Sequence, residues 1–382
     1  MTRRDFDRVW RVLDGQVASG RIPGYVAAVS LAGEAEVRAG GRMAVDGDSP
    51  PMREDTLFRI ASMTKPIGGA LSLSLVQDGV LGLDDPIERW LPEAALPRVL
   101  DAPGSPLDRT VEARRPITVR DLVCGTSGWG AVLEAGPLQQ AMMERDVYPG
   151  PLPPRLSADE FAARVCDLPL AFQPGEGWLY DTGIDLAGVL LARAAGRPLS
   201  DLVAERVTGP LGMASTSFGA RDVSRLATAY RPVAAGLEVL DPPDGLFAGP
   251  AAFEQLASGL VSTAPDLLRF FTAMASGGAP VLGPGGLAVL TADALTDAQR
   301  RQAEPIVGPG ASWALATAVD IAAPEVWMAP GRWGWTGGTG TDGHVDPARD
   351  AVAILLTQRT MTSPLDRPAE FWTAVAEAAR AG

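Results

Sequence analysis

Lysine and histidine are almost missing from this chain of 382 residues. One of its 33 basic residues, Lys65, is lysine and the rest are arginine, while His344 is the only histidine. The two cysteines, Cys124 and Cys166, lack the spacing of metal ligands and make no disulfide framework, so we expect reduced, half-buried thiols. With so few imidazole and thiolate groups, no protein-ligated metal site is expected. No cofactor is expected either.

An excess of basic charge is also missing. The 46 acidic residues outnumber the 33 basic ones and give a net charge of −13, which argues against nucleic acid or an anionic membrane as partner. The N-terminal sequence MTRRDFDRVWRVLDG mixes charges into its apolar positions, unlike a secretory signal. The most apolar run, residues 351–357, is too short to cross a bilayer. We therefore expect a cytoplasmic protein.

The periodicity of apolar residues predicts an α/β protein with strands at both ends and helices between them. Helices are expected at residues 3–20, 69–78, 119–124, 158–167, 184–195 and 369–380, and strands at 25–31, 35–39, 312–319, 338–345 and 351–358. This order suggests one unit over residues 1–382, with a discontinuous α/β subdomain (1–60 and 254–382) and a mainly helical one (61–253). Loops at 99–116, 145–157 and 232–250 are rich in proline, aspartate and glycine and could form the rim of a cleft.

The single lysine lies three residues after a serine, in the sequence Ser62-Met63-Thr64-Lys65. On a helix, residues at positions i and i+3 share a face, so the amine can reach the hydroxyl. Arginine cannot give up its proton in a protein, whereas a buried lysine can become neutral and act as a base. The pattern predicts a serine nucleophile activated by a lysine, at a helix N-terminus whose dipole favours an oxyanion. The plainer alternative is that Ser62 caps the helix and Lys65 is exposed.

Several longer segments, taken together in order and spacing from about residue 5 to 375, resemble the serine β-lactamase and penicillin-binding-protein superfamily. The similarity is strongest to the class C β-lactamase-like branch, which contains carboxylesterases of the family VIII type, D-amino peptidases, amide hydrolases and acyltransferases. The segments are Ser62-Met-Thr-Lys65, LVQDGVLGLDDPIERWLPE (75–93), TVRDLVCGTSGW (118–129), FQPGEGWLYDTGIDLAGVLLARAAGRPLSDLVAERVTGPLGM (172–213) and ASGLVSTAPDLLRFFTAMASGG (257–278). The resemblance implies an antiparallel sheet flanked by terminal helices, plus an all-helical subdomain.

The resemblance also implies the roles of two further motifs. The family's Tyr-x-Asn reads Tyr180-Asp181-Thr182 here, so the tyrosine that relays a proton matches, while Thr182 replaces the asparagine that contacts substrate. The family's Lys-Thr-Gly aligns with Trp335-Thr336-Gly337, which are expected to bind substrate, and the backbone N–H groups of Ser62 and Gly338 are expected to form the oxyanion hole. Trp335 offers an apolar wall and one N–H donor instead of a cation for a substrate carboxylate.

Three other patterns carry less weight. The match of GTGTDG (338–343) to a dinucleotide-binding fingerprint leads into a strand pattern instead of a helix. His344 and Asp346 could suggest a serine–histidine–aspartate triad, but the chain has no Gly-x-Ser-x-Gly elbow, so His344 is interpreted as structural. The acidic pairs Asp84-Asp85 and Glu34/Glu36 are interpreted as solvated turn residues and not as a glycosidase pair.

These residues predict a serine hydrolase that cleaves a small-molecule ester or neutral amide through a Ser62 acyl-enzyme, most simply a carboxylesterase. An acyltransferase would use the same acyl-enzyme, and a D-aminopeptidase or weak β-lactamase is a further alternative. Erosion of the motifs at Thr182 and Trp335 leaves a fourth possibility, a non-catalytic binding module. The sequence does not indicate the natural substrate, the acyl chain length or the oligomeric state.

Overall fold

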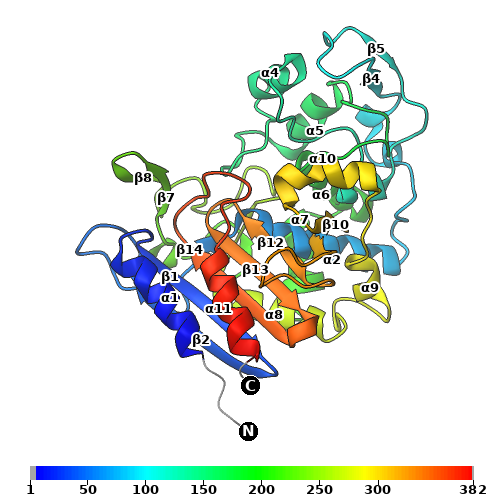
Figure 1. The fold of residues 1–382 in the computed structure, drawn as a ribbon. Coiled ribbons are helices and arrows are strands. Elements are labelled where there is room, and N and C mark those ends of the chain that lie inside the picture. The colour runs from blue at the N-terminus through cyan, green and yellow to red at the C-terminus, as the bar shows by residue number, and fades with distance from the viewer. Residues whose placement is uncertain (1–5, 381–382) are drawn as a thin grey trace.

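A seven-stranded antiparallel sheet forms one half of the molecule in the computed structural model, which describes residues 6–380 (Figure 1). The strands lie in the order β10-β11-β12-β13-β14-β1-β2. Their bounds are β1 (Gly24–Leu31), β2 (Glu34–Gly41), β10 (Ala311–Trp313), β11 (Ala318–Asp320), β12 (Trp333–Gly337), β13 (Thr341–Asp346) and β14 (Ala351–Thr357). The sheet therefore combines an N-terminal hairpin with the C-terminal part of the chain.

Strands from the two ends of the chain meet at the β1–β14 pair. The register pairs Tyr25 with Thr357 and Leu31 with Ala351, so the apolar run of β14 lies along the whole of β1. All residues of β14 and nearly all of β1 are buried, as expected for strands covered by helices on both faces. β2, at the edge of the sheet, is partly exposed.

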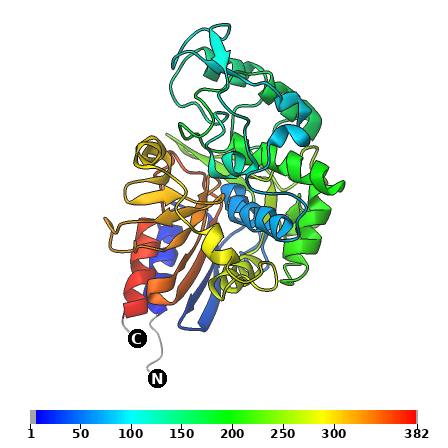
Figure 2. The same ribbon diagram turned by 90° about the vertical axis from the view of Figure 1, so that its right-hand side faces the viewer.

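Helices α1 (Asp7–Ala18) and α11 (Ala369–Arg380) pack against each other on one face of this sheet (Figure 1). α8 (Ala264–Ala275) contacts β1, β13 and β14, and the second view shows the sheet between the terminal helices and the rest of the chain (Figure 2). The expected α/β class, with terminal helices flanking an antiparallel sheet, is confirmed. Residues 3–5 of the helix expected at 3–20 lie outside the described residues.

The middle of the chain is mainly helical. Its helices are α2 (Thr64–Gln77), α3 (Val119–Cys124), α4 (Pro137–Glu144), α5 (Ala158–Cys166), α6 (Thr182–Ala195) and α7 (Leu199–Val203), followed in the chain by α8, α9 (Gly286–Leu290) and α10 (Asp297–Val307). Short strands interrupt them, namely β3 (Phe58–Arg59), β4 (Arg98–Leu100), β5 (Thr110–Glu112), β6 (Ser217–Phe218), β7 (Ala229–Val233), β8 (Gly236–Asp241) and β9 (Leu260–Ser262). The division into subdomains at residues 60 and 253 stays a prediction.

Two of the expected strands differ from those observed. The strand expected at 312–319 is a hairpin of β10 and β11, in which the Ala314 N–H bonds to the Thr317 carbonyl and Ala316 has a φ of 54°. This turn contains no glycine or proline, so the sequence carries no signal for it. The strand expected at 338–345 begins only at Thr341, because residues 338–340 form the turn between β12 and β13. Across residues 6–380, no helix has both the length and the apolarity needed to span a membrane.

Candidate active site

Ser62 lies in a single 3₁₀ turn (Ala61–Met63) that runs directly into α2. The turn follows β3, which pairs with β9, and the residue before the serine, Ala61, has a φ of 43°. Pro66 occupies the first turn of α2, where a missing N–H costs little. Residues 64–75 of α2 are all buried, so the helix that carries the site is held on every side.

Lys65 is fully buried, and its amine has three partners. The Nζ atom lies 3.0 Å from Ser62 Oγ and 2.9 Å from the Ala257 carbonyl oxygen, and it forms a close ion pair with the Asp181 carboxylate. Burial disfavours the ammonium, but the nearby Asp181 and Tyr180 groups together outweigh this effect, so the pKa of Lys65 is raised. The sequence predicts that Lys65 is an amine that burial can make neutral, and the ion pair with Asp181 departs from that prediction.

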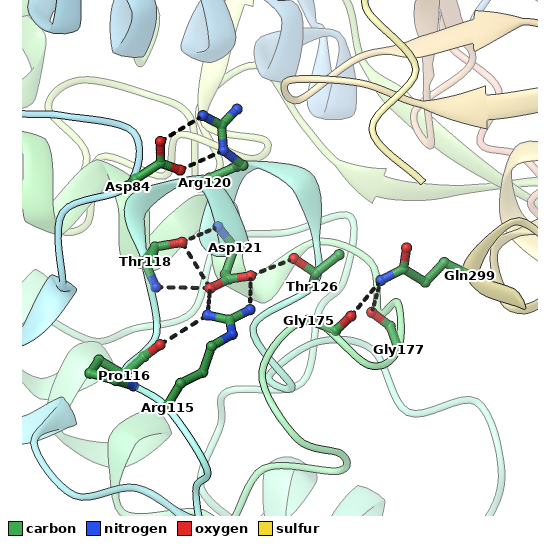
Figure 3. Close-up of polar contacts among 10 residues, drawn as sticks. All are labelled: Asp84, Arg115, Pro116, Thr118, Arg120, Asp121, Thr126, Gly175, Gly177 and Gln299. Carbon is green, nitrogen blue, oxygen red and sulfur yellow. Dashed lines mark hydrogen bonds and ion pairs between the residues drawn. The ribbon is translucent and has the colours of Figure 1, made fainter. Parts of the chain in front are cut away.

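Tyr180 is held by hydrogen bonds on both sides of its loop. The Leu179 N–H bonds to the Gly125 carbonyl, and the Tyr180 carbonyl accepts from the Ala131 N–H. Gln299 of α10 donates to the Gly175 and Gly177 carbonyls (Figure 3). The nearby Gln302 side chain accepts a hydrogen bond from the backbone N–H of Trp178. These contacts tie the loop to α10.

The segment that faces this loop is anchored by one buried carboxylate (Figure 3). Asp121 in α3 accepts two hydrogen bonds from Arg115, two from the capping residue Thr118 and one from Thr126. The Thr126 carbonyl in turn accepts from the Gly175 N–H. The aspartate thus holds both the start of a helix and one side of the loop that carries the tyrosine.

The Tyr180 hydroxyl accepts a hydrogen bond of 2.6 Å from the Trp335 indole N–H. The Lys65 Nζ lies 4.3 Å from the centre of the phenol ring. Burial raises the pKa of Tyr180, and the Lys65 cation, together with hydrogen bonds from Ser62 and Trp335, opposes that rise. Ser62, Lys65 and Tyr180 therefore share one polar cluster. The N–H that Trp335 was expected to offer a substrate is used within the protein.

Strand β12 runs beside the nucleophile turn. A side chain at Gly337 would come within 2.3 Å of the Ile60 carbonyl oxygen, so this close approach requires glycine. Thr336 donates to the buried Asp342 carboxylate at 2.7 Å. Gly338 has open space where a side chain would stand, and both it and Ser62 line the same cleft, as an oxyanion hole would require.

Thr182, like Gly337, is expected to bind substrate but is not among the described residues that line this cleft. It is the first residue of α6, is buried, and lines a neighbouring pocket with Asp185 and Gln255, where its hydroxyl has no hydrogen-bond partner among residues 6–380. Asp181, the middle residue of the Tyr-x-Asn motif position, makes the contact with Lys65 instead. This contact could have been predicted from the sequence, because a buried lysine needs a counter-charge and Asp181 is adjacent to Tyr180.

The cleft in front of Ser62 has a volume of about 500 Å³ and a largely apolar wall. Residues 148–151 and Leu240 come from two of the three loops expected at a rim, whereas the loop at 99–116 contributes none of the described lining residues. The charged side chains among that lining are Asp181 and Arg231, and Arg231 pairs with Glu238 at 2.9 Å.

The rejected patterns lie elsewhere or have another structure. His344 is buried in β13, bonds to Asp342 at 2.8 Å and packs its ring against Trp372 of α11, 5.1 Å away. Residues 338–340 form the turn between β12 and β13 and residues 341–343 begin β13, so this segment leads into a strand and not into a helix. Cys124 and Cys166 are free, the first buried and the second half-buried.

Comparison with known proteins places these features in context. The sequence profile named Beta-lactamase matches residues 9–378. Protein Rv1367c of Mycobacterium tuberculosis is 38% identical over 84% of this chain and 81% of its own length. Esterase EstB of Burkholderia gladioli is 32% identical over 94% of this chain and 92% of its own. The structure of EstCE1, a hydrolase with promiscuous acyltransferase activity, superimposes with a TM-score of 0.83 at 24% identity, covering 98% of this chain and 97% of that one.

Proposed function

This chain belongs to the Beta-lactamase family, and on that basis we propose that it is a serine hydrolase that cleaves carboxylic esters through an acyl-enzyme on Ser62. The observation that carries the proposal is the contact of 3.0 Å between Lys65 Nζ and Ser62 Oγ at the floor of an open cleft. A nucleophile and base within hydrogen-bond reach, with the base held by further groups, is the arrangement that activates a serine.

In the proposed reaction, Ser62 Oγ bonds to the acyl carbon while its proton passes to the neutral Lys65 amine. The carbonyl oxygen gains the electron pair and faces the N–H groups of Ser62 and Gly338. As the bond to the leaving oxygen breaks, that oxygen receives a proton from the Tyr180 hydroxyl, and Lys65 returns the proton to Tyr180. In the second half of the reaction, water attacks the acyl carbon through the same proton transfers and releases the carboxylic acid from Ser62.

A neutral ester fits the cleft better than an anionic lactam. Trp335 stands where the family motif has a lysine, and its N–H is bonded to Tyr180. The one cationic side chain among the described lining residues, Arg231, is paired with Glu238. The similarity to esterase EstB also favours a carboxylesterase. An alcohol that enters in place of water would make the same acyl-enzyme an acyltransferase.

The test compares wild type with Ser62→Ala. Wild type should be labelled by a fluorophosphonate, with a mass increase of one adduct, and should turn over short-chain p-nitrophenyl esters, whereas Ser62→Ala should do neither. Hydrolysis of nitrocefin at the rate of the best ester would overturn the substrate class. Absence of both labelling and turnover in folded wild type would favour a non-catalytic binding module.

A further inference from the structure

Asp181 stands in an unusual backbone position beside the catalytic cluster. Its φ of 82° and ψ of −75°, with the Thr182 N–H bonded to the Tyr180 carbonyl at 3.2 Å, describe a γ-turn of the strained, positive-φ kind. A residue other than glycine is strained in this region and persists there only where its surroundings impose the conformation. The turn places the Asp181 carboxylate against Lys65 while the Tyr180 hydroxyl contacts Trp335.

The three partners of Lys65 differ in what they can do. The Asp181 carboxylate and the Ala257 carbonyl can only accept hydrogen bonds, so each takes one N–H of the lysine whether it is an ammonium or an amine. The Ser62 hydroxyl can accept or donate. In the ammonium form the third N–H points at Ser62, and in the amine form the lone pair does.

We infer that Asp181 is a positioning residue for catalysis, which together with the Ala257 carbonyl occupies two of the three bonding directions of the Lys65 nitrogen and leaves the third for Ser62. This inference rests on the proposed acyl-enzyme function. Because the carboxylate also stabilises the positive charge on the nitrogen, Asp181 sets the pH above which the amine is free to accept the Ser62 proton.

The groups that face Lys65 come from three parts of the chain. Ser62 belongs to the turn before α2, Tyr180 and Asp181 to the loop before α6, and Asp185 to α6 itself. Burial raises the pKa of Asp185 to about 7, and the Asp181 charge adds to the rise. Asp185 accepts hydrogen bonds from the Gln255 side chain and from the Ala257 N–H and does not contact Lys65 in this structure. Asp181 is therefore the direct counter-charge of Lys65.

The test is the rate of fluorophosphonate labelling across about pH 6 to 12 for the full chain, wild type and Asp181→Asn, because the raised pKa of Lys65 puts the wild-type rise above the ordinary lysine value of about 10.4. The asparagine keeps an oxygen acceptor, tolerates a positive φ and removes the charge. An opposite charge at this range is worth about 1–3 pKa units. We therefore expect the rising limb of the pH–rate profile of Asp181→Asn to lie about 1–3 pH units below that of wild type, so that the variant is labelled faster at the acid end of the pH range.

Asp84→Asn is the matched control, because it removes the same charge from an exposed ion pair with Arg120. Its profile should coincide with that of wild type. Asp181→Gly removes the acceptor as well and relieves the strained φ, so it should show the same displaced limb with a plateau at least about tenfold lower than that of Asp181→Asn, because the amine is no longer aimed at Ser62.

Two results would overturn the inference. One is a folded Asp181→Asn protein whose rising limb coincides with that of wild type, since a merely structural carboxylate would alter stability and scale the rate equally at every pH. The other is a plateau in Asp181→Gly equal to that in Asp181→Asn. Wild type that labels at no pH would instead contradict the proposed function, so the two failures are distinguishable.

Discussion

Two buried cations flank the nucleophile turn, Arg59 in β3 and Lys65 in α2, and each pairs with a carboxylate. Arg59 bonds to Asp241 at 2.6 Å and to the carbonyls of Ala227 and Pro242 at 2.5 and 2.6 Å. Lys65 pairs with Asp181 and the Ala257 carbonyl, but its third partner is the Ser62 hydroxyl. All partners of the arginine are acceptors, whereas one partner of the lysine can also donate a proton.

This difference explains why one site requires lysine. A guanidinium presents a fixed fork of donors and keeps its proton, which suits three immobile acceptors. An ammonium can lose a proton and then accept one from a hydroxyl. Burial lowers the pKa of Arg59, yet its Asp241 partner opposes this, and the pair ties β3 to the end of β8 as a structural joint.

Lys65→Arg should have the largest effect, although it keeps the charge and matches the residue used elsewhere in the chain. A guanidinium, with a pKa above about 12, cannot take the Ser62 proton near neutral pH. We expect the labelling rate to fall by about 10⁴, the upper end for a positioned acid or base. Labelling and thermal unfolding are measured on the same sample, and a folded variant that labels at the wild-type rate would refute the role of Lys65 as the base.

Tyr180→Phe sharpens the comparison by removing the hydroxyl that lies next to the Lys65 pair. The ring and its packing against Trp313 remain, so the fold should be kept. Acylation should slow by roughly 10²–10⁴, because the proton to the leaving group loses its donor. Measured kcat/KM for a p-nitrophenyl ester equal to that of wild type would make Tyr180 a packing residue.

His344 and Asp342 form a third buried pair, in which burial lowers the pKa of the histidine more than the carboxylate raises it. Burial and the nearby Arg332 charge lower the pKa of His344 to about 4, so the folded protein holds it neutral. In the unfolded chain the histidine binds its proton near pH 6.5. The contribution of His344 to the free energy of unfolding is therefore fully present above that pH and is lost as the pH falls toward about 4, because protonation then favours the unfolded chain. The loss amounts to about 3 kcal/mol.

The measurement is the free energy of unfolding in urea at neutral pH and near pH 4.5, for wild type and His344→Asn. The asparagine amide can still donate to Asp342 and does not titrate. Its stability should therefore fall less than that of wild type over this interval. Equal losses in the two proteins would show that other groups dominate the acid sensitivity.

Arg59→Lys is the mirror image of the first substitution and should have the smallest effect. One ammonium cannot span three acceptors placed for a fork, so a buried acceptor loses its partner at a cost of about 1–3 kcal/mol. The labelling rate of the folded variant should stay close to that of wild type. A rate loss as large as that of Lys65→Arg would mean that the two cations are parts of one catalytic unit.

The sequence alone determined the local features of the site, because these depend on spacing. The interval of three residues brings Lys65 to Ser62 on consecutive helical turns, and the runs at 119–124 and 369–380 form helices with those bounds. Tyr180 was identified from its motif and not from spacing to Ser62, and the use of lysine against an arginine background indicated chemistry that arginine cannot perform.

Only the tertiary structure decided which distant groups meet. The γ-turn at Asp181 sends the carboxylate to Lys65, while Thr182, the expected motif position, lies outside the cleft. The Trp335 indole reaches Tyr180 because β12 and the loop before α6 converge from opposite sides of the site. Such contacts depend on the path of the backbone over more than a hundred residues, and neither the spacing of residues along the chain nor their composition encodes that path directly.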